Sequence, residues 1–174
     1  FENVPSFVFA LDAKVEVPGL GTITVDVAYG GMIYVLVDAA SIGFNIDKAE
    51  ASRLVEVGER IKKAAAEQLP AIHPENPEIH TINQTLFAGP LEEHDGVKRS
   101  RNAVIVSPGR IDRSPCGTGT SARLAVMHAR GQVAIGETFI HESIIGTEFI
   151  GRVLGETTCG GKGAICPAIT GQAW

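Results

Sequence analysis

A single cysteine lies where a tight turn is predicted to lead into a helix. Residues 112–121 read Asp-Arg-Ser-Pro-Cys-Gly-Thr-Gly-Thr-Ser, so a carboxylate at Asp112 precedes the Cys116 thiol by four positions. The following segment, 122–132, carries apolar residues at helical spacing and then a glycine, Gly131. This pattern predicts a helix that begins at or just after Cys116 and stops at Gly131. Three residues could cap it: Thr118, Thr120 and Ser121.

The predicted first turn has the chemistry of an anion site. Its backbone N–H groups are free donors, and Gly117 and Gly119 would let the chain turn sharply and let a ligand approach those groups. The positive end of the helix dipole also stabilises negative charge on the Cys116 sulfur. One turn could thus bind a carboxylate and hold a base. On this pattern alone the alternative is that Cys116 is a small buried hydrophobe and Asp112 a turn residue.

The segment 112–121 resembles the second cysteine motif of the proline racemase family. That family includes proline racemases, 4-hydroxyproline 2-epimerases and 3-hydroxyproline dehydratases. The resemblance continues through residues 136–153, Gly-Glu-Thr-Phe-Ile-His-Glu-Ser-Ile-Ile-Gly-Thr-Glu-Phe-Ile-Gly-Arg-Val, and reappears in 3–7, 26–31 and 167–171. It therefore covers essentially the whole chain.

This resemblance implies a reaction and a role for each site residue. Family members invert the carbon next to the carboxylate of a proline-type substrate with two cysteines, one on each face of the ring, and need no cofactor. Cys116 resembles one of these two bases, and Asp112 resembles the carboxylate that receives the ring ammonium. The backbone amides of Gly117 and Thr118 are expected to hold the substrate carboxylate. A cysteine at position 116, where the dehydratases have a threonine, argues against a dehydratase.

The family's first cysteine motif, a Met-Cys-Gly-His-Gly type of turn, is absent from the sequence. We therefore expect residues 1–174 to form one domain, the second cysteine-bearing half of a two-domain epimerase, truncated at both ends. The chain opens at Phe1 and stops at Trp174, each within an expected strand. Alone it would be inactive, because it offers a base on one face only, and its missing N-terminal half is the expected partner. Neither Cys159 nor Cys166 matches a catalytic motif.

The substrate is indicated by one position, Val106. Proline-specific relatives tend to have an aromatic residue there, six positions before Asp112, and a smaller side chain leaves room for a ring hydroxyl. The sequence thus favours a 4-hydroxyproline 2-epimerase that converts trans-4-hydroxy-L-proline into cis-4-hydroxy-D-proline. Two alternatives remain open: a proline racemase, and a module that binds small carboxylates without catalysis.

Composition excludes several other classes of protein. The chain has 174 residues, a hydrophobic fraction of 44% and a formal net charge of -5, which are typical of one globular domain without a basic surface for nucleic acid. Its apolar runs are too short to cross a membrane. Three cysteines without a paired spacing argue against a disulfide framework or a zinc site, so we expect no metal and a cytoplasmic location. The family resemblance is consistent with a homodimer.

The expected fold is α+β and of the diaminopimelate epimerase type, with antiparallel strands wrapped around the Cys116 helix. The pattern predicts a hairpin over 15–27 that turns at Pro18-Gly19, followed by a strand over 32–39. The glycines at 30 and 31 are interpreted as structural. A helix is predicted over 47–69, capped by Asp47 and ended by Pro70, with one face formed by Leu54, Val55, Gly58 and Ile61.

Strands are also predicted over 79–88 and 102–106, joined by a polar connection over 91–101. A loop over 107–110 would deliver Asp112 to the site, and a strand pair within 136–153 would bend at Gly146. His141 and Glu142 are expected to support the site rather than react. His73, His80 and His128 have no ligand spacing.

Overall fold

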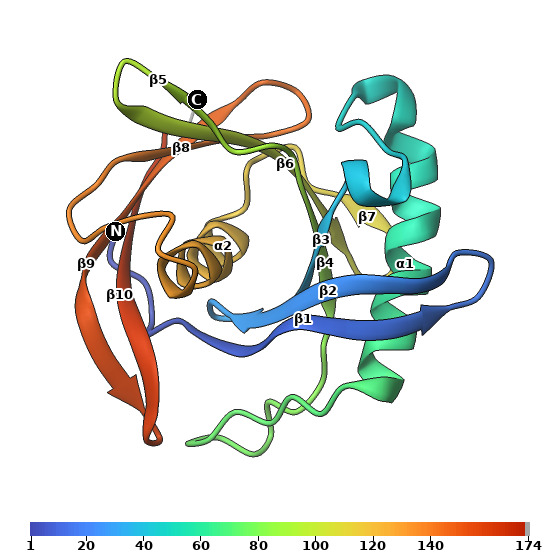
Figure 1. Cartoon of the computed structure of the whole chain (residues 1–174), viewed down its shortest axis with the longest axis horizontal. Helices are drawn as coiled ribbons and strands as arrows, with labels where there is room; N and C mark the ends of the chain where they lie inside the picture. The colour runs from blue at the N-terminus through green and yellow to red at the C-terminus, as the bar shows by residue number, and fades with distance from the viewer. Residues whose placement is uncertain (173–174) are drawn as a thin grey trace.

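The computed structural model describes residues 1–172, which form one curved sheet around a central helix and a second helix outside it (Figure 1). Among these residues there are ten strands. They are β1 (Phe7–Val17), β2 (Gly21–Tyr29), β3 (Ile33–Asp38), β4 (Gln84–Ala88), β5 (Glu92–His94), β6 (Val97–Val106), β7 (Arg110–Ile111), β8 (Phe139–Glu142), β9 (Glu148–Cys159) and β10 (Lys162–Thr170). The helices are α1 (Ala51–Gln68) and α2 (Gly117–Ala129), with short 3-10 turns η1 (Ala40–Ile42) and η2 (Lys48–Glu50).

The strand order is β1-β2-β3-β4-β6-β8-β9-β10, and the short strands β5 and β7 both pair with β6. Pairs β3–β4 and β6–β8 are parallel, and the other pairs are antiparallel. The two ends of the sheet meet, because Ser6 and Ile165 exchange backbone hydrogen bonds of 2.9 and 2.8 Å. The predicted α+β fold of the diaminopimelate epimerase type, with strands around the Cys116 helix, is thus confirmed, although two of the pairs are parallel.

Helix α2 lies inside the curve of the sheet and is apolar on two sides. Toward β2, β3, β4 and β6 it buries Ala122 and Val126 against Tyr34 and Leu86. Toward β8, β9 and β10, its Leu124, Ala125 and Met127 pack in a second buried cluster, with Phe139, Val153, Ile165 and Ile169 of these strands. A helix that is apolar on opposite sides must be covered on both, which is why the sheet closes around it.

Helix α1 covers the outer face of β1, β3, β4 and β6. The predicted face is largely confirmed, since Leu54, Gly58 and Ile61 are buried. Gly58 allows close packing, because a Cβ there would lie 2.6 Å from Ile105 Cγ1. The start of the helix differs from the prediction: Asp47 accepts a hydrogen bond from Ala49 N and caps η2, after which α1 begins at Ala51.

The predicted hairpins near both ends of the chain are confirmed, whereas the strands expected at the two termini have different bounds. The 15–27 hairpin is confirmed by the register Val15↔Ile23 and Val17↔Gly21 in β1 and β2. The pair within 136–153 is confirmed by β8 and β9, which are joined across Gly146. The strand that was expected to run to the C-terminus ends at Thr170, and residues 173–174 lie outside the described part of the chain. At the other end, β1 begins at Phe7 rather than at Phe1, although Glu2 forms an isolated bridge to Ala168.

Two predictions in the middle of the chain are wrong. The polar connection expected over 91–101 is a β-hairpin, in which β5 pairs with the first half of β6 across Asp95-Gly96. Both turn residues have positive φ, of 52° and 74°, as a two-residue hairpin turn requires. The strand expected over 79–88 is confined to β4, and residues 79–83 form an irregular segment before it.

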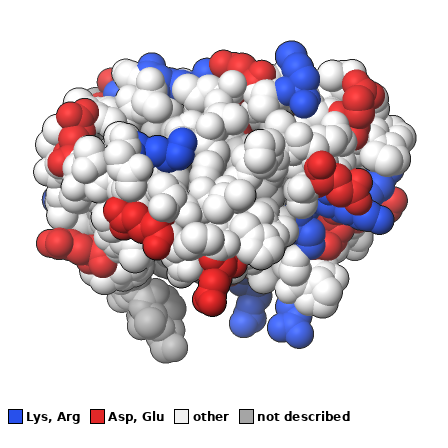
Figure 2. Space-filling model, turned by 90° about the horizontal axis from the view of Figure 1, so that it is seen from below, with Lys and Arg blue, Asp and Glu red and all other residues white. Residues whose placement is uncertain are grey.

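Charged side chains are dispersed on the face of the molecule shown in Figure 2. On the face shown in Figure 2, basic and acidic residues lie interspersed among many uncharged ones, without a continuous basic area on that face. Within residues 1–172, no helix combines the length and apolarity that a membrane span requires.

Candidate active site

Cys116 itself caps helix α2. Its backbone has φ 67° and ψ 118°, and its Sγ accepts a hydrogen bond from Gly119 N at 3.4 Å. The predicted start of the helix is therefore confirmed, but the predicted caps, Thr118, Thr120 and Ser121, are wrong. A residue other than glycine with positive φ is uncommon, and such conformations concentrate at functional sites.

The sharp turn lies at Cys116 and not at the two glycines, which corrects the expectation for Gly117 and Gly119. Neither glycine has positive φ. Gly119 instead leaves little room for a side chain, since a Cβ there would lie 3.3 Å from both Cys116 Sγ and Leu86 Cδ1. The N–H groups of Gly117 and Thr118 form no hydrogen bond within residues 1–172, so they remain free donors at the helix start, as predicted.

Tyr34 on β3 is a site residue that the sequence analysis missed. Its hydroxyl lies 3.2 Å from Cys116 Sγ and 2.7 Å from Thr118 Oγ1. Burial, reinforced by the nearby Cys116 and Asp112, raises the pKa of Tyr34 well above its usual value, so the phenol stays protonated. The only signal in the sequence is a polar hydroxyl within the apolar run 32–37, because the contact with Cys116 is long-range.

Asp112 lies at the same end of α2 as Cys116, as predicted. Asp112 N donates to Val104 O at 2.9 Å, which continues the pairing of β6 and β7 into the loop. Asp112 Oδ1 accepts from Ser114 N at 2.9 Å, and Ser114 Oγ accepts from Cys116 N at 3.0 Å. This chain of hydrogen bonds fixes the carboxylate relative to the cysteine. Asp112 Oδ2 has no hydrogen bond within residues 1–172.

The model of a known family matches the entire chain. It is described as proline racemase and matches residues 1–174. The chain belongs to the proline racemase family.

Two solved structures show how close this similarity is. A probable proline racemase from Agrobacterium radiobacter K84, with bound carbonate, is 43% identical with a TM-score of 0.90, over 98% of this chain and 49% of its own. A hydroxyproline epimerase from Agrobacterium vitis, with bound trans-4-hydroxy-L-proline, is 42% identical with a TM-score of 0.90, over 98% of this chain and 48% of its own. The chain thus spans about half the length of these two members of the proline racemase family.

Two buried polar side chains, Thr120 and His141, form hydrogen bonds behind Cys116. Thr120 Oγ1 donates its proton to Cys116 O at 2.7 Å, so it must accept from His141 Nδ1, which lies 2.9 Å away. His141 is fully buried, and burial together with the charge of Arg123 lowers its pKa to about 3. A neutral His141 that holds the first turn of α2 fits the supporting role expected for it.

Gly30 allows the sheet to approach the start of α2. A Cβ at Gly30 would lie 2.2 Å from Thr118 O and 2.5 Å from Ala122 N, which are backbone atoms of the helix. Asn3 closes the same region, because its Nδ2 donates to Gly30 O at 2.8 Å and to Ser121 Oγ at 2.9 Å. The structural interpretation of this glycine is therefore supported, and the contact it makes belongs to the site.

The other cysteines and histidines lie elsewhere. Cys159 Sγ is 3.8 Å from His73 Nε2 in the core beside β1, where burial raises the pKa of the Cys159 thiol. Cys166 faces Gly155 in the β9–β10 register. His128 Nε2 lies 2.8 Å from Glu156 Oε1. Within residues 1–172, no group of three or more His, Cys, Asp or Glu is placed to hold a metal ion.

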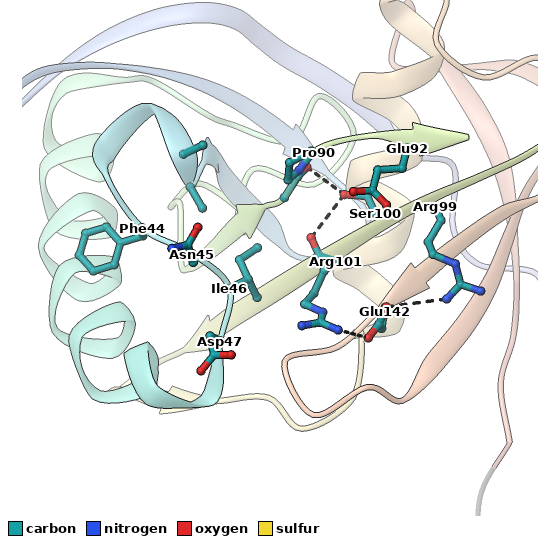
Figure 3. A pocket seen from close by; sticks show the side chains of 13 residues that line it. Phe44, Asn45, Ile46, Asp47, Pro90, Glu92, Arg99, Ser100, Arg101 and Glu142 are labelled. Carbon is teal, nitrogen blue, oxygen red and sulfur yellow. Dashed lines mark hydrogen bonds and ion pairs between the residues drawn. The ribbon is translucent and has the colours of Figure 1, made fainter. Parts of the chain in front are cut away.

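A hollow lies away from Cys116. We call it the Arg101 cleft; it has a volume of about 400 Å³, and ten of the residues that line it are labelled in Figure 3. Arg101 pairs with Glu142, and Arg99 pairs with Glu142 at 3.7 Å and with Glu148. Asp47 is occupied by its bond to Ala49 N. Arg99, Arg101 and Glu142 thus already have charged partners, and Glu142 serves an ion pair rather than the Cys116 end of α2.

Proposed function

We propose that this chain is the second cysteine-bearing half of a 4-hydroxyproline 2-epimerase that works without a cofactor. The observation that carries the proposal is the position of the Cys116 sulfur. It caps α2 within 3.6 Å of three hydrogen-bonding groups, namely Gly119 N, the Tyr34 hydroxyl and the Thr118 hydroxyl. A sulfur so surrounded can carry negative charge and act as a base.

The substrate would bind across the start of α2. Its carboxylate would accept hydrogen bonds from the free N–H groups of Gly117 and Thr118, at the positive end of the helix dipole. Its ring ammonium would pair with Asp112, whose Oδ1 is already fixed by Ser114 N. This arrangement supports the assignment of Asp112, Cys116, Gly117 and Thr118 as site residues.

Proton transfer then follows from the same geometry. The Cys116 thiolate takes the proton from the carbon next to the carboxylate, an S–H bond forms as the C–H bond breaks, and the electron pair moves into the carboxylate. The amides of Gly117 and Thr118 stabilise that charge. A thiol on the opposite face, from a second half of the protein, returns a proton and inverts the carbon. Because this chain holds Cys116 on one face only, we expect it to be inactive alone.

Hydroxyproline is favoured over proline by two observations. Val106 is small and half-buried at the end of β6, which leaves room for a ring substituent. The similar protein from Agrobacterium vitis is described as a hydroxyproline epimerase. This chain is about equally similar to a probable proline racemase, so proline remains the alternative substrate.

The deciding experiment follows optical rotation with trans-4-hydroxy-L-proline and with L-proline, using a protein that contains this chain together with the N-terminal half that bears the first cysteine motif, which we call the two-half protein. We expect turnover of hydroxyproline by that protein and none by residues 1–174. Preference for L-proline would make the protein a racemase. Calorimetric binding of either compound without turnover would instead favour a carboxylate-binding module, and turnover by residues 1–174 would contradict the need for two bases.

A further inference from the structure

Gln84 is a buried polar residue without an assigned role. It is the first residue of β4, 7% exposed, and its Oε1 is buried with no hydrogen-bond partner within residues 1–172. Leaving a buried amide oxygen without a donor costs about 1–3 kcal/mol. A hydrogen-bond donor outside the described residues would therefore stabilise Gln84 Oε1.

The side chain of Gln84 lies on the α2 side of the sheet. Side chains alternate along a strand, and the neighbouring Thr85 points to the other side, where its Oγ1 donates to Gly58 O of α1 at 2.8 Å. Leu86, two positions after Gln84, packs in the cluster around α2. Gln84 therefore shares the face of Leu86.

Gln84 also lies at the Cys116 end of α2. Leu86 already reaches the first turn of the helix, since its Cδ1 would lie 3.3 Å from a Cβ on Gly119. From Leu86, β4 continues toward Ala88 and the later turns of α2. Gln84, two residues before Leu86, therefore lies beside or just beyond the first turn of α2.

The residues opposite Gln84 on the two neighbouring strands lie on the same side of the sheet. In the β3–β4 register Gln84 faces Tyr34, whose hydroxyl contacts Cys116 Sγ, and in the β4–β6 register it faces Val106. Gln84 is thus the amide-bearing residue in a row whose other members are a phenol bound to the cysteine and a small apolar side chain.

We propose that Gln84 recognises the ring hydroxyl of the substrate and determines the preference for hydroxyproline over proline. The proposal rests on the proposed function. A ring hydroxyl can donate its proton to Gln84 Oε1 and accept from the Gln84 amide N–H, so one contact satisfies both groups. Proline offers no hydroxyl and would leave the buried oxygen without a donor, which is the type of difference that discriminates strongly between substrates. Val106 beside it supplies the space and Gln84 supplies the polarity.

The test compares the ratio of kcat/KM for trans-4-hydroxy-L-proline to kcat/KM for L-proline in the two-half protein. Gln84→Leu removes the amide, and Gln84→Met provides a second variant of similar length in case the first fails to fold. We expect the ratio to fall by about 10-fold or more in either variant, as the loss of a buried hydrogen bond predicts, mainly through hydroxyproline. Thr85→Val is the matched control, since it removes a hydroxyl from the adjacent residue on the opposite face and should leave the ratio unchanged.

The outcomes separate the two proposals. An active wild-type enzyme whose ratio is unchanged by Gln84→Leu and Gln84→Met overturns the role of Gln84 and leaves the proposed function standing. A wild-type enzyme that prefers L-proline, or turns over neither compound, overturns the hydroxyproline assignment and this role with it.

Discussion

The Cys116 site and the Arg101 cleft differ in how far their polar groups are satisfied. We define the Cys116 site as Tyr34, Asp112, Cys116, Gly117 and Thr118. The Arg101 cleft is a hollow of about 400 Å³, yet its arginines and Glu142 are paired with one another. The Cys116 site has free amide donors, a carboxylate oxygen and a cysteine in an uncommon backbone conformation. Unsatisfied polar groups, rather than the size of a hollow, therefore indicate where a ligand would bind.

The largest difference between the two regions should follow from Cys116→Ser. A serine hydroxyl is a far weaker base than a thiolate, and loss of a positioned base lowers rate by about 10²–10⁴-fold. We expect kcat/KM of the two-half protein to fall by about 10³-fold. Cys166→Ser, which changes a thiol on β10 opposite Gly155 of β9, should leave kcat/KM within about twofold. Equal losses in both variants would show that Cys116 has no special role.

The next largest effect should come from Gly30→Ala. The added Cβ would lie 2.2 Å from Thr118 O, and a backbone atom within a packed helix cannot move aside easily. The free energy of unfolding should fall by about 3 kcal/mol, as for severe overpacking, in a urea titration. Gly155→Ala is the control, because its Cβ would meet nothing within 4 Å, and it should change stability by less than about 1 kcal/mol. A stable Gly30→Ala protein would mean that β2 and α2 can separate without cost.

The buried chain behind the Cys116 site should make stability depend on pH. The folded-state pKa of His141, about 3, is lower than its usual 6.5, so between these values the unfolded chain binds a proton that the folded chain does not. Stability from this group is constant above pH 6.5 and falls by about 1.4 kcal/mol per pH unit below it. Urea titrations at pH 7 and pH 5 should therefore differ by roughly 2 kcal/mol more in the wild type than in His141→Gln. His80→Gln, at an exposed position, should retain the wild-type difference.

Tyr34→Phe should have a smaller effect that is confined to the Cys116 site. It removes the hydroxyl 3.2 Å from the sulfur, and a hydrogen bond to a charged group contributes about 1.5–3 kcal/mol. We expect kcat of the two-half protein to fall roughly tenfold with little change in KM, because the hydroxyl contacts the Cys116 sulfur and the Thr118 side chain and not the backbone N–H groups proposed to hold the carboxylate. Tyr29→Phe, where the ring packs against His73 instead, should leave kcat unchanged. A rise in KM with constant kcat would assign Tyr34 to substrate binding.

The smallest effect should come from the Arg101 cleft. Arg101→Gln breaks a partly exposed ion pair, and Glu142 retains Arg99 at 3.7 Å, so the free energy of unfolding should change by less than about 1 kcal/mol. Turnover by the two-half protein should be unchanged. A tenfold loss of kcat/KM would erase the distinction drawn between the two regions.

Local sequence patterns predicted much of this structure. The hairpin of β1 and β2, the buried face of α1 and the start of α2 each depend on periodicity and turn residues within a short segment. The sequence could also predict that Asp112 and Cys116 lie at the same end of α2, because they are separated by only a few residues. The resemblance carried by residues 112–121 then gave the fold around them.

The features that escaped prediction depend on distant or unusual contacts. Tyr34 lies 82 positions from Cys116, and no local pattern reports that contact. Strand β5 is exposed at all three residues, so it lacks the apolar alternation of a half-buried strand. The cap by a cysteine sulfur is not among the common helix caps, which is why hydroxyl residues were predicted instead.

The closure of the sheet around α2 also bears on how the chain acquires its structure. Ser6, just before β1, and Ile165 on β10 exchange backbone hydrogen bonds although they lie far apart in the sequence. Contacts of such long sequence separation slow folding, because loop entropy is lost before they form. During synthesis, moreover, the apolar side of α2 that faces β9 and β10 stays uncovered until these two strands emerge. We expect slow folding, with the Cys116 turn reaching its final conformation only when the segment before β1 has met β10.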